Sequence, residues 1–412
     1  MTGLLIRQSQ SNVVGNSIED SLNPLLRVVV ANGGYQMRHA RRAVDDLITP
    51  LVERDPTVMG LVGGGRSVAQ TESAVGVLGA HGIPILTTTL TSETLPPLSP
   101  LYFQMVAGDR TQALLIAEYA KSIGKSVTVY HPDLAQEPDR YLHSLHDQFA
   151  GLARGNDAIR LRAWRTPSTA EVECRSDEVA FYAGRETGFT DFLGHVLDTC
   201  PAAVKPTVVG DDTITRVIAQ GESRRSDRFS GVSLGYVSLA NRIVLAGTSC
   251  VARGRPAVDD GDPDGQRPLR IFCAGLHGLY QPRDDRAAGW KAFGAELAAQ
   301  GGDRRWTGER AGLAYDAAGL YLAALVLDKR RAVPGAGDLK PNRAAVAQEL
   351  RELDCADPQS PACFKGVTGR IDFRAGRDGA RRPLAVLTVN DITASDVSPV
   401  CAYRFQDTAP CG

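Results

Sequence analysis

The 412-residue sequence lacks a charge excess, an internal repeat, and any cysteine pair spaced for zinc. Its 46 Lys and Arg residues balance 47 Asp and Glu residues, for a formal net charge of -1. This balance argues against nucleic acid or an anionic membrane surface as the main partner. We also find no 18-residue apolar stretch, so no membrane-spanning segment is expected. The length and a hydrophobic fraction of 43% predict a globular protein of two well-packed domains.

Eight cysteines are present, and none falls in a C-x-x-C pair. The seven histidines are scattered elsewhere, so we expect neither a metal site nor a cofactor. An even cysteine count without metal spacing favours disulfides and an oxidising, extracytoplasmic compartment, with reduced and buried thiols as the alternative. Pairing between sequence neighbours is the simplest of the possible connectivities. The neighbour pairs are Cys174–Cys200, Cys250–Cys273, Cys355–Cys363 and Cys401–Cys411.

Residues 57–95 form the stretch around which the chain is organised. Residues 58–62 predict a buried strand, the glycines at 63–65 a turn, and the apolar spacing after Ser67 a helix. A second strand is expected at 83–86 and ends, like the first, in small hydroxyl residues. Parallel neighbours bring such ends to the same edge of a sheet, beside a helix N-terminus that can bind an anion. This βαβ unit predicts a polar pocket for a small molecule.

The rest of the chain alternates strands and helices, which predicts an α/β protein with mostly parallel sheets. Pro50 is expected to end or bend its helix, and Asp109 with Gln112 to form a capping box. The turn-rich residues 366–379 and the strand at 384–389 together predict a final hairpin region. We expect strands at 25–30, 126–130, 178–183, 206–209 and 384–389. We expect helices at 4–12, 40–48, 109–124, 141–152, 287–300, 313–327 and 344–353, and one more that follows the strand at 178–183 and ends near residue 199.

Two catalytic motifs are matched only in part. Residues 60–67 fit a P-loop except that Arg66 stands where the motif has lysine, and arginine is not equivalent there. Residues 231–235, GVSLG, match a nucleophile elbow. The elbow needs an apolar strand directly before the serine, and the preceding RRSDRFS is polar. We therefore expect no enzyme activity, with a hydrolase using Ser233 as the least favoured alternative.

Several motifs follow residues 57–95 in order: FQMVAGDRTQALLIAEYAKSIGKSVTVYHP, AFYAGRETGFTDFL, PTVVGDD, AYDAAGLYLAAL and GVTGRIDFRAGRDG. Together they resemble the type I periplasmic (extracytoplasmic) substrate-binding proteins of ABC transporters, in the branched-chain amino acid (Leu/Ile/Val) family. The resemblance implies two lobes joined by a hinge, each a mostly parallel sheet flanked by helices. Lobe one would comprise residues 1–106 and 276–365, lobe two 107–275, and 366–412 the hinge return and the C-terminal segment of lobe two.

The resemblance also implies a strand and a ligand loop ahead of the first helix, which corresponds here to residues 4–12. We therefore expect that the first strand of lobe one is missing from this sequence, together with any export signal. The start of the sequence itself lacks the long apolar core of a signal peptide. Without that strand, the sheet of lobe one would have a gap at a central position and the lobe would be poorly stable on its own.

The family's ligand contacts fall on seven positions of this sequence. The hydroxyl residues of lobe one can equally serve as a helix cap or a turn, and Asp212 of lobe two can equally be a cap. An aromatic residue at helical spacing, such as Tyr141, is more often part of the core. Arg185 stands where relatives place an aromatic side chain, and a guanidinium there would favour an anionic group. Asp212, or its neighbour Asp211, would bind the ligand's ammonium group. The expected ligand-binding residues are Ser67, Thr71, Thr89, Thr91, Tyr141, Arg185 and Asp212.

This resemblance implies a solute-binding protein that captures a small polar ligand, an amino acid or a related compound, between its lobes for an ABC-type uptake system. Its partners would be that ligand and a membrane permease. The alternative is the ligand-sensing domain of a receptor or signalling protein, which uses the same fold. A transporter component should have a permease encoded nearby, whereas a sensor should carry a signalling domain or a transmembrane helix.

Overall fold

The computed structural model divides into two compact units. Unit 1 contains the described residues of Met1–Val106 and Arg310–Arg382 with Phe272, and unit 2 contains those of Ala107–Asp260 and Pro383–Gly412 with Glu309. The described residues are 1–14, 25–164, 172–215, 217, 229, 231–240, 272, 309–331, 342–357, 360, 362–374, 376, 377, 379, 382, 384–389 and 397–403. The expected helix at 287–300 lies outside these residues.

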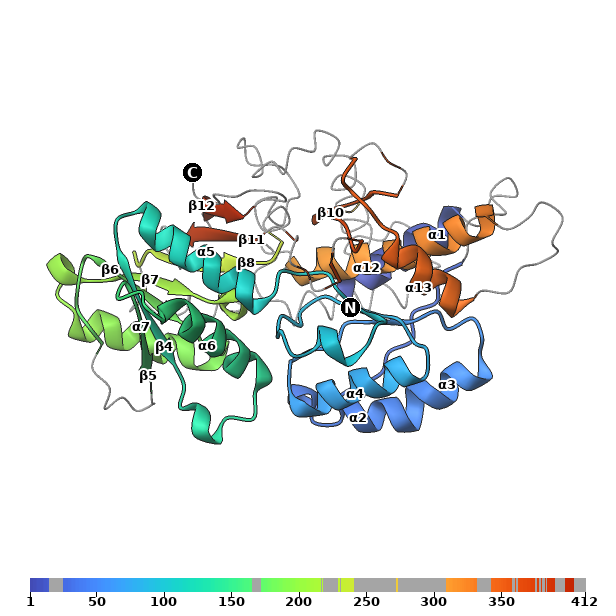
Figure 1. Cartoon of the computed structure of the whole chain (residues 1–412), viewed down its shortest axis with the longest axis horizontal. Coiled ribbons are helices and arrows are strands. Elements are labelled where there is room, and N and C mark those ends of the chain that lie inside the picture. The colour runs from blue at the N-terminus through green and yellow to red at the C-terminus, as the bar shows by residue number, and fades with distance from the viewer. Residues whose placement is uncertain are drawn as a thin grey trace, which may run out of the picture. The chain divides into compact units, whose positions relative to one another are not determined.

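Unit 2 is built on a seven-stranded sheet with the strand order β12-β11-β8-β7-β6-β4-β5 (Figure 1). The strands from β5 to β8 are parallel neighbours, and β11 and β12 add antiparallel pairs at one edge. The central strand β6 is buried along its whole length, as expected for a strand covered on both faces. The strands are β4 Ser126–His131, β5 Ile159–Ala163, β6 Glu178–Tyr182, β7 Thr207–Gly210, β8 Leu234–Ser238, β11 Leu384–Val389 and β12 Val397–Tyr403.

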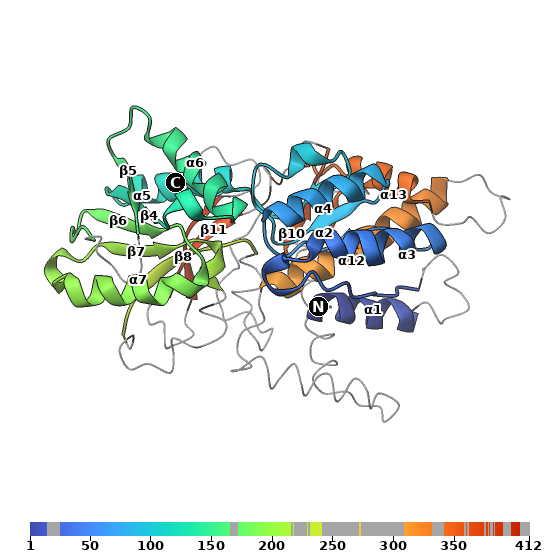
Figure 2. The same ribbon diagram turned by 90° about the horizontal axis from the view of Figure 1, so that it is seen from below.

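Helices cover both faces of this sheet, with α5 and α6 packed together on one face and α7 on the other (Figures 1 and 2). Beneath α7 lies an aromatic core in which the ring centroid of Phe192 is 5.1 Å from that of Trp164 and 5.2 Å from that of Tyr130. The helices are α5 Asp109–Ser122, α6 Arg140–Ala153 and α7 Glu186–Thr199, with 3-10 turns at Leu134–Gln136, Ala202–Val204 and Asp212–Ile214. The sequence therefore predicted β4, β6, β7, β11 and the three helices of this unit, but it missed the strands β5, β8 and β12.

Unit 1 contains a three-stranded parallel sheet, β1-β2-β3, and a separate antiparallel hairpin formed by β9 and β10. The strands are β1 Leu61–Val62, β2 Ile85–Thr87, β3 Tyr102–Gln104, β9 Phe364–Gly366 and β10 Gly369–Ile371. The helices are α1 Thr2–Val14, α2 Ala40–Ala43, a π-helical turn Val44–Ile48, α3 Thr49–Arg54, α4 Ala69–Ala80, α12 Glu309–Arg331 and α13 Arg343–Arg351, with 3-10 turns at Tyr35–Met37 and Pro96–Leu98. The hairpin confirms the prediction only in part, because the strand at 384–389, β11, does not join it and pairs instead with β8 and β12 of unit 2.

Two strand predictions in unit 1 are wrong. Residues 25–30 form no strand, and the strand predicted at 58–62 is reduced to the two residues of β1. Among the described residues β1 pairs only with β2, so its other edge has no neighbouring strand. A strand with one neighbour forms half of its ladder of hydrogen bonds, which explains why both segments fall short of the apolar pattern.

The prediction that Pro50 ends or bends its helix is not contradicted: helical structure continues to Arg54, but an irregular π-helical turn, Val44–Ile48, directly precedes Thr49 and Pro50. One other helix prediction is wrong. Asp109 forms no capping box, since the N-cap of α5 is Gly108 and no side chain caps that helix. The side chain of Gln112 is instead used elsewhere, as described below.

The long helix α12 contains a window, Glu309–Leu327, that is long and apolar enough to cross a membrane. We expected from the sequence that no apolar stretch of this length occurs, and that prediction is wrong. However, 72% of that window is buried inside the protein, and Leu313, Ala317 and Leu320 are almost completely enclosed. A mostly buried helix of this kind is the core helix of a globular lobe.

Asp316 of α12 connects this helix to the β9–β10 hairpin. Its two carboxylate oxygens accept hydrogen bonds from the backbone N–H groups of Val367 and Thr368, each at 2.9 Å, and Oδ2 also accepts from the Thr368 hydroxyl at 2.6 Å. Gly366 is required beside it, because a Cβ there would lie 2.3 Å from Asp316 Oδ2. The motifs AYDAAG and GVTG, about 50 residues apart in the sequence, thus meet at one buried carboxylate.

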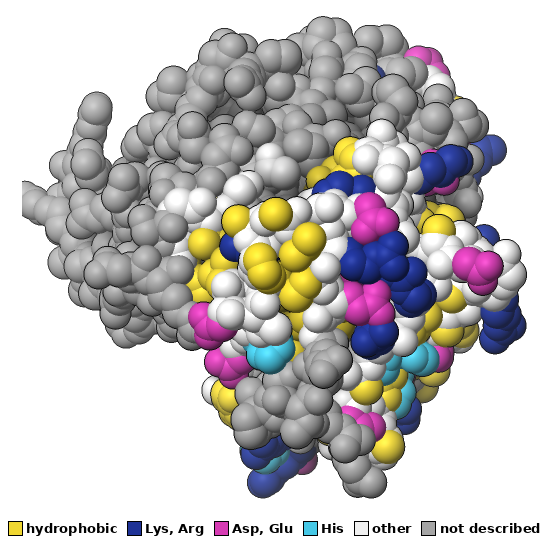
Figure 3. Space-filling view, turned by 90° about the vertical axis from the view of Figure 1, so that its left-hand side faces the viewer, with side chains coloured by type: hydrophobic (Ala, Val, Ile, Leu, Met, Phe, Trp, Pro, Cys, Tyr) yellow, Lys and Arg dark blue, Asp and Glu magenta, His cyan; other side chains and the backbone are white. Residues whose placement is uncertain are grey.

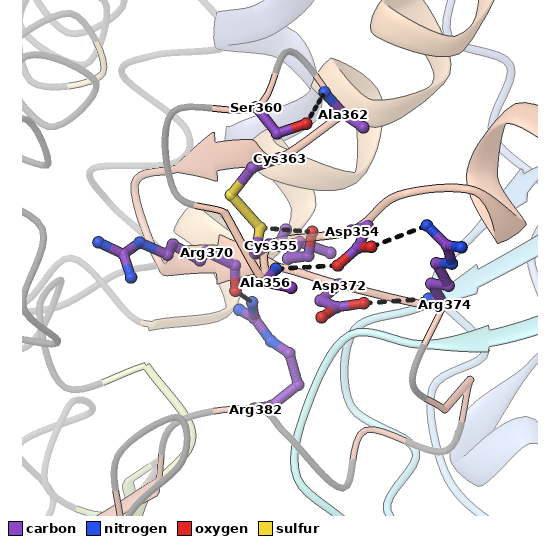
Figure 4. The surroundings of a disulfide bond; sticks show 11 residues. Asp354, Cys355, Ala356, Ser360, Ala362, Cys363, Arg370, Asp372, Arg374 and Arg382 are labelled. Atoms are coloured by element: carbon purple, nitrogen blue, oxygen red, sulfur yellow. Dashed lines mark hydrogen bonds and ion pairs between the residues drawn. A yellow bond between two sulfur atoms is a disulfide. The ribbon is translucent and has the colours of Figure 1, made fainter.

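Two disulfides are present among the described residues. Cys174–Cys200 in unit 2 has a Cα–Cα distance of 5.2 Å, and Cys355–Cys363 in unit 1 one of 4.4 Å. Figure 4 shows the second bond beside Arg374, which donates to Asp354 through its side chain and to Asp372 through its backbone N–H. These two neighbour pairs are confirmed, whereas Cys250–Cys273 and Cys401–Cys411 lie outside the residues whose side chains the structure describes.

Candidate functional site

In unit 2, polar side chains gather beyond the carboxyl ends of neighbouring parallel strands. Asp211 and Asp212 follow β7, Arg185 follows the end of β6, and Asp139 and Tyr141 stand at the start of α6, which comes after β4. Since these strands are parallel, their carboxyl ends share one edge of the sheet. We refer to these five residues as the unit 2 cluster.

Tyr141 is the centre of the cluster. Its hydroxyl oxygen lies 2.7 Å from Asp211 Oδ2 and 2.7 Å from Asp212 Oδ1, and its side chain is almost completely buried. A phenol has one hydrogen and can donate to only one of these carboxyl groups. The second short contact therefore requires a hydrogen on the other carboxyl group. Burial and the nearby negative charges of Asp211, Asp212 and Asp109 raise the pKa of Tyr141 well above its usual value, so the phenol stays protonated.

The raised pKa of Asp211 makes it the carboxyl group that favours this hydrogen. Burial and, next, the charge of Asp212 raise the pKa of Asp211 well above its usual value, although hydrogen bonds from Thr213 and Tyr141 oppose the shift. Asp211 Oδ1 accepts from the backbone N–H of Thr213 at 2.9 Å, which is the bond of a cap at the Asp212–Ile214 turn. A protonated Asp211 can donate to Tyr141, and Tyr141 can then donate to Asp212.

Arg185 is held by a carboxylate of the same cluster. Its Nε and Nη2 atoms donate to Asp139 Oδ2 and Oδ1, each at 2.7 Å, and its guanidinium carbon lies 4.3 Å from the centre of the Tyr141 ring. Burial alone would lower the pKa of Arg185, but the hydrogen bonds and charge of Asp139 raise it above its usual value. Asp139 thus already occupies one edge of the Arg185 guanidinium, which we expected to bind an anionic group of the ligand.

Two further residues of the first turn of α5 belong to this site. Gln112 Oε1 accepts from the backbone N–H of Asp212 at 3.1 Å, and Asp109 is fully buried with its charge acting on Tyr141. The sequence placed both in a capping box, because the same three-residue spacing serves a cap and a shared helix face. Asp139 was not predicted at all, although an aspartate between a strand and the helix that follows it was an available signal.

In unit 1, the ends of β1 and β2 meet as the sequence predicted. The Thr89 hydroxyl, after β2, donates to the carbonyl of Gly65, after β1, at 2.9 Å. The Thr71 hydroxyl donates to the carbonyl of Arg66 at 2.7 Å. Gly65 adopts a φ of 69°, and a Cβ there would lie 2.5 Å from the sulfur of Met37, so the turn requires glycine.

The four expected unit 1 residues are thus near one turn but differ in exposure. Ser67, Thr71 and Thr91 are each 2% exposed, whereas Thr89 is partly exposed. Ser67 does not cap α4, whose N-cap is Val68 with no side-chain bond. The hydroxyls of Thr71 and Thr89 both satisfy backbone carbonyls of the turn itself, which is the local role the sequence also allowed. Ligand contact by these residues stays a prediction, as it does for Tyr141, Arg185 and Asp212 in unit 2.

The nucleophile-elbow pattern does not form an elbow. Ser233 directly precedes β8, whereas an elbow serine follows its strand and stands before a helix. Because β8 is parallel to β7, Ser233 lies at the opposite end of the strands from Asp211 and Asp212. On the face of unit 2 shown in Figure 3, acidic and basic side chains lie next to one another, as expected from the balanced composition.

No protein-family model matches the chain, and no curated protein matches it in sequence. Solved structures match it over nearly its whole length. A substrate-binding protein of an ABC transporter from Desulfitobacterium hafniense, solved with leucine, is 17% identical with a TM-score of 0.62, covering 97% of this chain and 94% of that one. A branched-chain amino acid transporter substrate-binding protein from Streptococcus pneumoniae, solved with isoleucine, is 15% identical with a TM-score of 0.59, covering 97% and 93%.

A third similar structure broadens the range of ligands seen on this fold. The solute-binding protein of an ABC transporter from Rhodopseudomonas palustris, solved with p-hydroxybenzoic acid, is 12% identical with a TM-score of 0.57, covering 98% of this chain and 93% of that one. The chain therefore has the α/β fold of the two-lobed, type I periplasmic binding proteins. At these identities the likeness defines the fold, and the solute has to be argued from the residues.

Proposed function

We propose that this protein is a solute-binding protein of an ABC-type uptake system, which binds a small polar solute and performs no chemistry on it. The observation that carries the proposal is the unit 2 cluster. A buried phenol, two adjacent carboxyl groups and an arginine lie at the carboxyl edge of a parallel sheet, where α/β proteins bind ligands. The fold supports it, since the similar structures come from substrate-binding proteins.

The solute class follows from the charges of the cluster. Asp139 already neutralises Arg185 through two hydrogen bonds, so the neighbouring carboxyl groups of Asp211, Asp212 and Asp109 leave the region with more acidic than basic groups. Such a region favours a solute with an ammonium group over a simple anion. An amino acid or a related amine fits this charge preference.

An extracytoplasmic location and a permease partner complete the proposal. The disulfides Cys174–Cys200 and Cys355–Cys363 support an oxidising compartment, where such bonds form and persist. A solute-binding protein of this fold delivers its solute to a membrane permease. The balanced net charge gives no reason to expect nucleic acid or an anionic membrane surface as the main partner instead.

A thermal-shift screen of amino acids, amines and small carboxylates on the full chain tests the proposal. A solute that binds the folded protein raises the melting temperature by mass action. Any solute that does so is then titrated by calorimetry against Asp212→Asn, with Asp157→Asn as the matched control because Asp157 is exposed in the same unit. We expect Asp212→Asn to weaken binding by about 1.5–3 kcal/mol, on the order of ten- to a hundred-fold.

The second part of the test uses an analogue of the bound amino acid that lacks the amine. An α-keto acid with the same side chain should bind much more weakly than the amino acid, because it has no group for Asp212 to accept from. Equal affinity for the two compounds would contradict the acidic character assigned to the site. A solute whose affinity changes in neither Asp212→Asn nor Arg185→Ala would show that the unit 2 cluster is not the binding surface.

A further inference from the structure

Two histidine side chains of unit 2 lie in contact with one another and take no part in the unit 2 cluster. His131 is the last residue of β4, and His146 lies in α6, which packs against that strand (Figure 1). The centroids of the two rings are 4.7 Å apart, and the ring planes are inclined at 71°. Motif spacing in the sequence predicted no metal site, because only the packing of a helix on a strand brings these two side chains together.

The hydrogen bonds of the two rings define which ring nitrogen carries the hydrogen. His131 Nδ1 lies 2.8 Å from the carbonyl oxygen of Pro132, and His146 Nδ1 lies 3.2 Å from Asp147 Oδ1. Because a carbonyl or carboxylate oxygen accepts hydrogen bonds, both Nδ1 atoms are donors. In the neutral form of each ring, Nε2 therefore has no hydrogen and keeps a free lone pair.

Metal-binding histidines have this same arrangement of partners. Such a histidine binds the metal through one nitrogen and donates the N–H of the other to a backbone carbonyl or a carboxylate, which fixes the tautomer and the ring orientation. His131 has the carbonyl partner, and His146 has the carboxylate partner. Among the described residues, no hydrogen bond engages the Nε2 atom of either ring. Both Nε2 atoms are therefore available as ligands.

The distance between the two rings fits one shared cation. A metal about 2.0–2.1 Å from each Nε2 lies about 3.2 Å from each ring centroid, so a nitrogen–metal–nitrogen angle of about 90–109° separates the centroids by about 4.5–5.3 Å. The observed separation of 4.7 Å falls within this range. A cation can therefore bind to both rings without moving α6 away from β4.

The pair is both anchored and accessible. The backbone of His131 is held in the sheet, where its carbonyl oxygen accepts from the Trp164 N–H at 2.6 Å. His131 is partly exposed and the side chain of His146 is 27% exposed, so a cation can reach the pair from solvent. Burial lowers the pKa of His131 below its usual value, although the hydrogen bond to Pro132 opposes the shift. The lowered pKa keeps the ring neutral, and able to bind a cation, at neutral pH.

We propose that His131 and His146 bind one divalent transition-metal ion, Cu²⁺ or Zn²⁺, through their two Nε2 atoms, with water molecules as the remaining ligands. Imidazole nitrogen suits these ions, whereas Mg²⁺ and Ca²⁺ prefer oxygen. Among the residues that the structure describes, no group of three His, Cys, Asp or Glu side chains is placed to hold a metal, so water completes the coordination. This inference goes beyond solute binding and does not rest on the proposed function.

Two protein ligands imply an affinity well below that of a complete four-ligand zinc site. We expect a dissociation constant on the order of 1–100 µM for Zn²⁺ at about pH 7.5. The constant should be lower for Cu²⁺, which binds nitrogen ligands more tightly. A bound ion joins β4 to α6 and should raise the melting temperature by mass action.

The first test titrates the metal-free full chain with Cu²⁺. Calorimetry measures the affinity, and EPR spectra of the bound Cu²⁺ count its nitrogen ligands, which should be two imidazoles at the tightest site. His131→Gln and His146→Gln should each weaken this site at least about tenfold, because one ligand is lost. His143→Gln is the matched control and should leave the affinity unchanged. His143 lies on the same helix, but its Nε2 contacts the backbone carbonyl of Glu137 at 2.7 Å.

The second test uses the unsubstituted protein and so does not depend on the folding of any variant. Zn²⁺ should raise the melting temperature at about pH 7.5, whereas Mg²⁺ at the same concentration should not. The affinity for Zn²⁺ should fall at least about tenfold at about pH 5.5, because protons compete for the same two nitrogens. Asp133 and Asp147 are the acidic groups beside the rings, and their charges favour the bound cation.

Three results would overturn the proposal. EPR spectra with fewer than two imidazole nitrogens at the tightest site would place the ion elsewhere. Equal Cu²⁺ affinity in the parent chain, His131→Gln and His146→Gln would show that the pair is not the site, as would an equal loss in His143→Gln. Equal effects of Mg²⁺ and Zn²⁺ on the melting temperature would show that imidazole is not the ligand. Solute binding is measured on the same proteins, and its outcome tests the proposed function independently.

Discussion

The guanidinium of Arg185 is joined to the carboxylate of Asp139 by two parallel hydrogen bonds of 2.7 Å, across 46 residues of sequence. Both side chains are largely buried, with 15% and 9% of their surfaces exposed. A planar pair of this kind fixes the guanidinium over the Tyr141 ring. Arg185 is therefore a positioning group for Tyr141 as much as a potential ligand contact, which changes the chemistry expected of the site.

Breaking this pair should be costly because it leaves a buried charge without its partner. We expect Asp139→Ala to lower the free energy of unfolding in urea by about 3 kcal/mol. The control is Asp46→Ala, which removes the partner of Arg42 in an exposed pair at 3.0 Å and should cost less than about 1 kcal/mol. Similar losses in the two variants would mean that the Arg185–Asp139 pair contributes no more than a surface pair.

The raised pKa of Asp211 should appear in the pH dependence of stability. The folded state holds this proton more tightly than the unfolded state, so the contribution is fully present below the unfolded pKa of about 3.9 and is lost as pH rises through the raised folded pKa. Asp211→Asn removes the titration while keeping a donor for Tyr141 and an acceptor for Thr213. Relative to the parent chain, the variant should therefore become more stable as pH rises from about 4 to about 8.

Comparing the parent and Asp211→Asn at each pH cancels the other titrating groups, such as Asp316, whose pKa burial also raises. The measurement is chemical unfolding in matched buffers across the pH range. A difference between the two proteins that does not change with pH would contradict the assignment of a proton to Asp211.

Removing the Tyr141 hydroxyl should leave Asp211 and Asp212 without the group that they share. We expect Tyr141→Phe to lower the free energy of unfolding by about 1–3 kcal/mol at neutral pH. Tyr35→Phe is the matched control, because Tyr35 is 72% exposed and its substitution should fall within about 0.5 kcal/mol of the parent. Equal stability of all three proteins would show that the hydroxyl bridge is energetically unimportant.

The two disulfides should stabilise the protein by amounts that increase with the length of the loop that each one closes. The separations are 26 residues for Cys174–Cys200 and 8 residues for Cys355–Cys363. Loop-closure entropy gives about 3.5 and about 2.5 kcal/mol, so replacing the first pair by serine should lower the melting temperature more than replacing the second. Intact mass after alkylation, with and without reductant, counts the bonds, and eight thiols alkylated without reductant would contradict both disulfides.

Local pattern was sufficient for much of this protein. Apolar spacing placed the central strands and helices of unit 2, turn residues placed the β9–β10 hairpin, and neighbour spacing placed both described disulfides. These features depend on residues close together in the chain, whose preferences the sequence displays directly. The alternation of strand and helix was likewise enough to define the α/β fold that the similar solved structures share.

The tertiary structure alone decided which polar groups meet and which apolar segments are paired. Tyr141 reaches Asp211 and Asp212 across about 70 residues, and Arg185 reaches Asp139 rather than facing a solute unpaired. The strand pattern of residues 25–30 was correct as a preference, but a strand forms only beside a neighbour that completes its hydrogen bonds. Pairing is a property of two segments brought together in space, and no single stretch of sequence contains it.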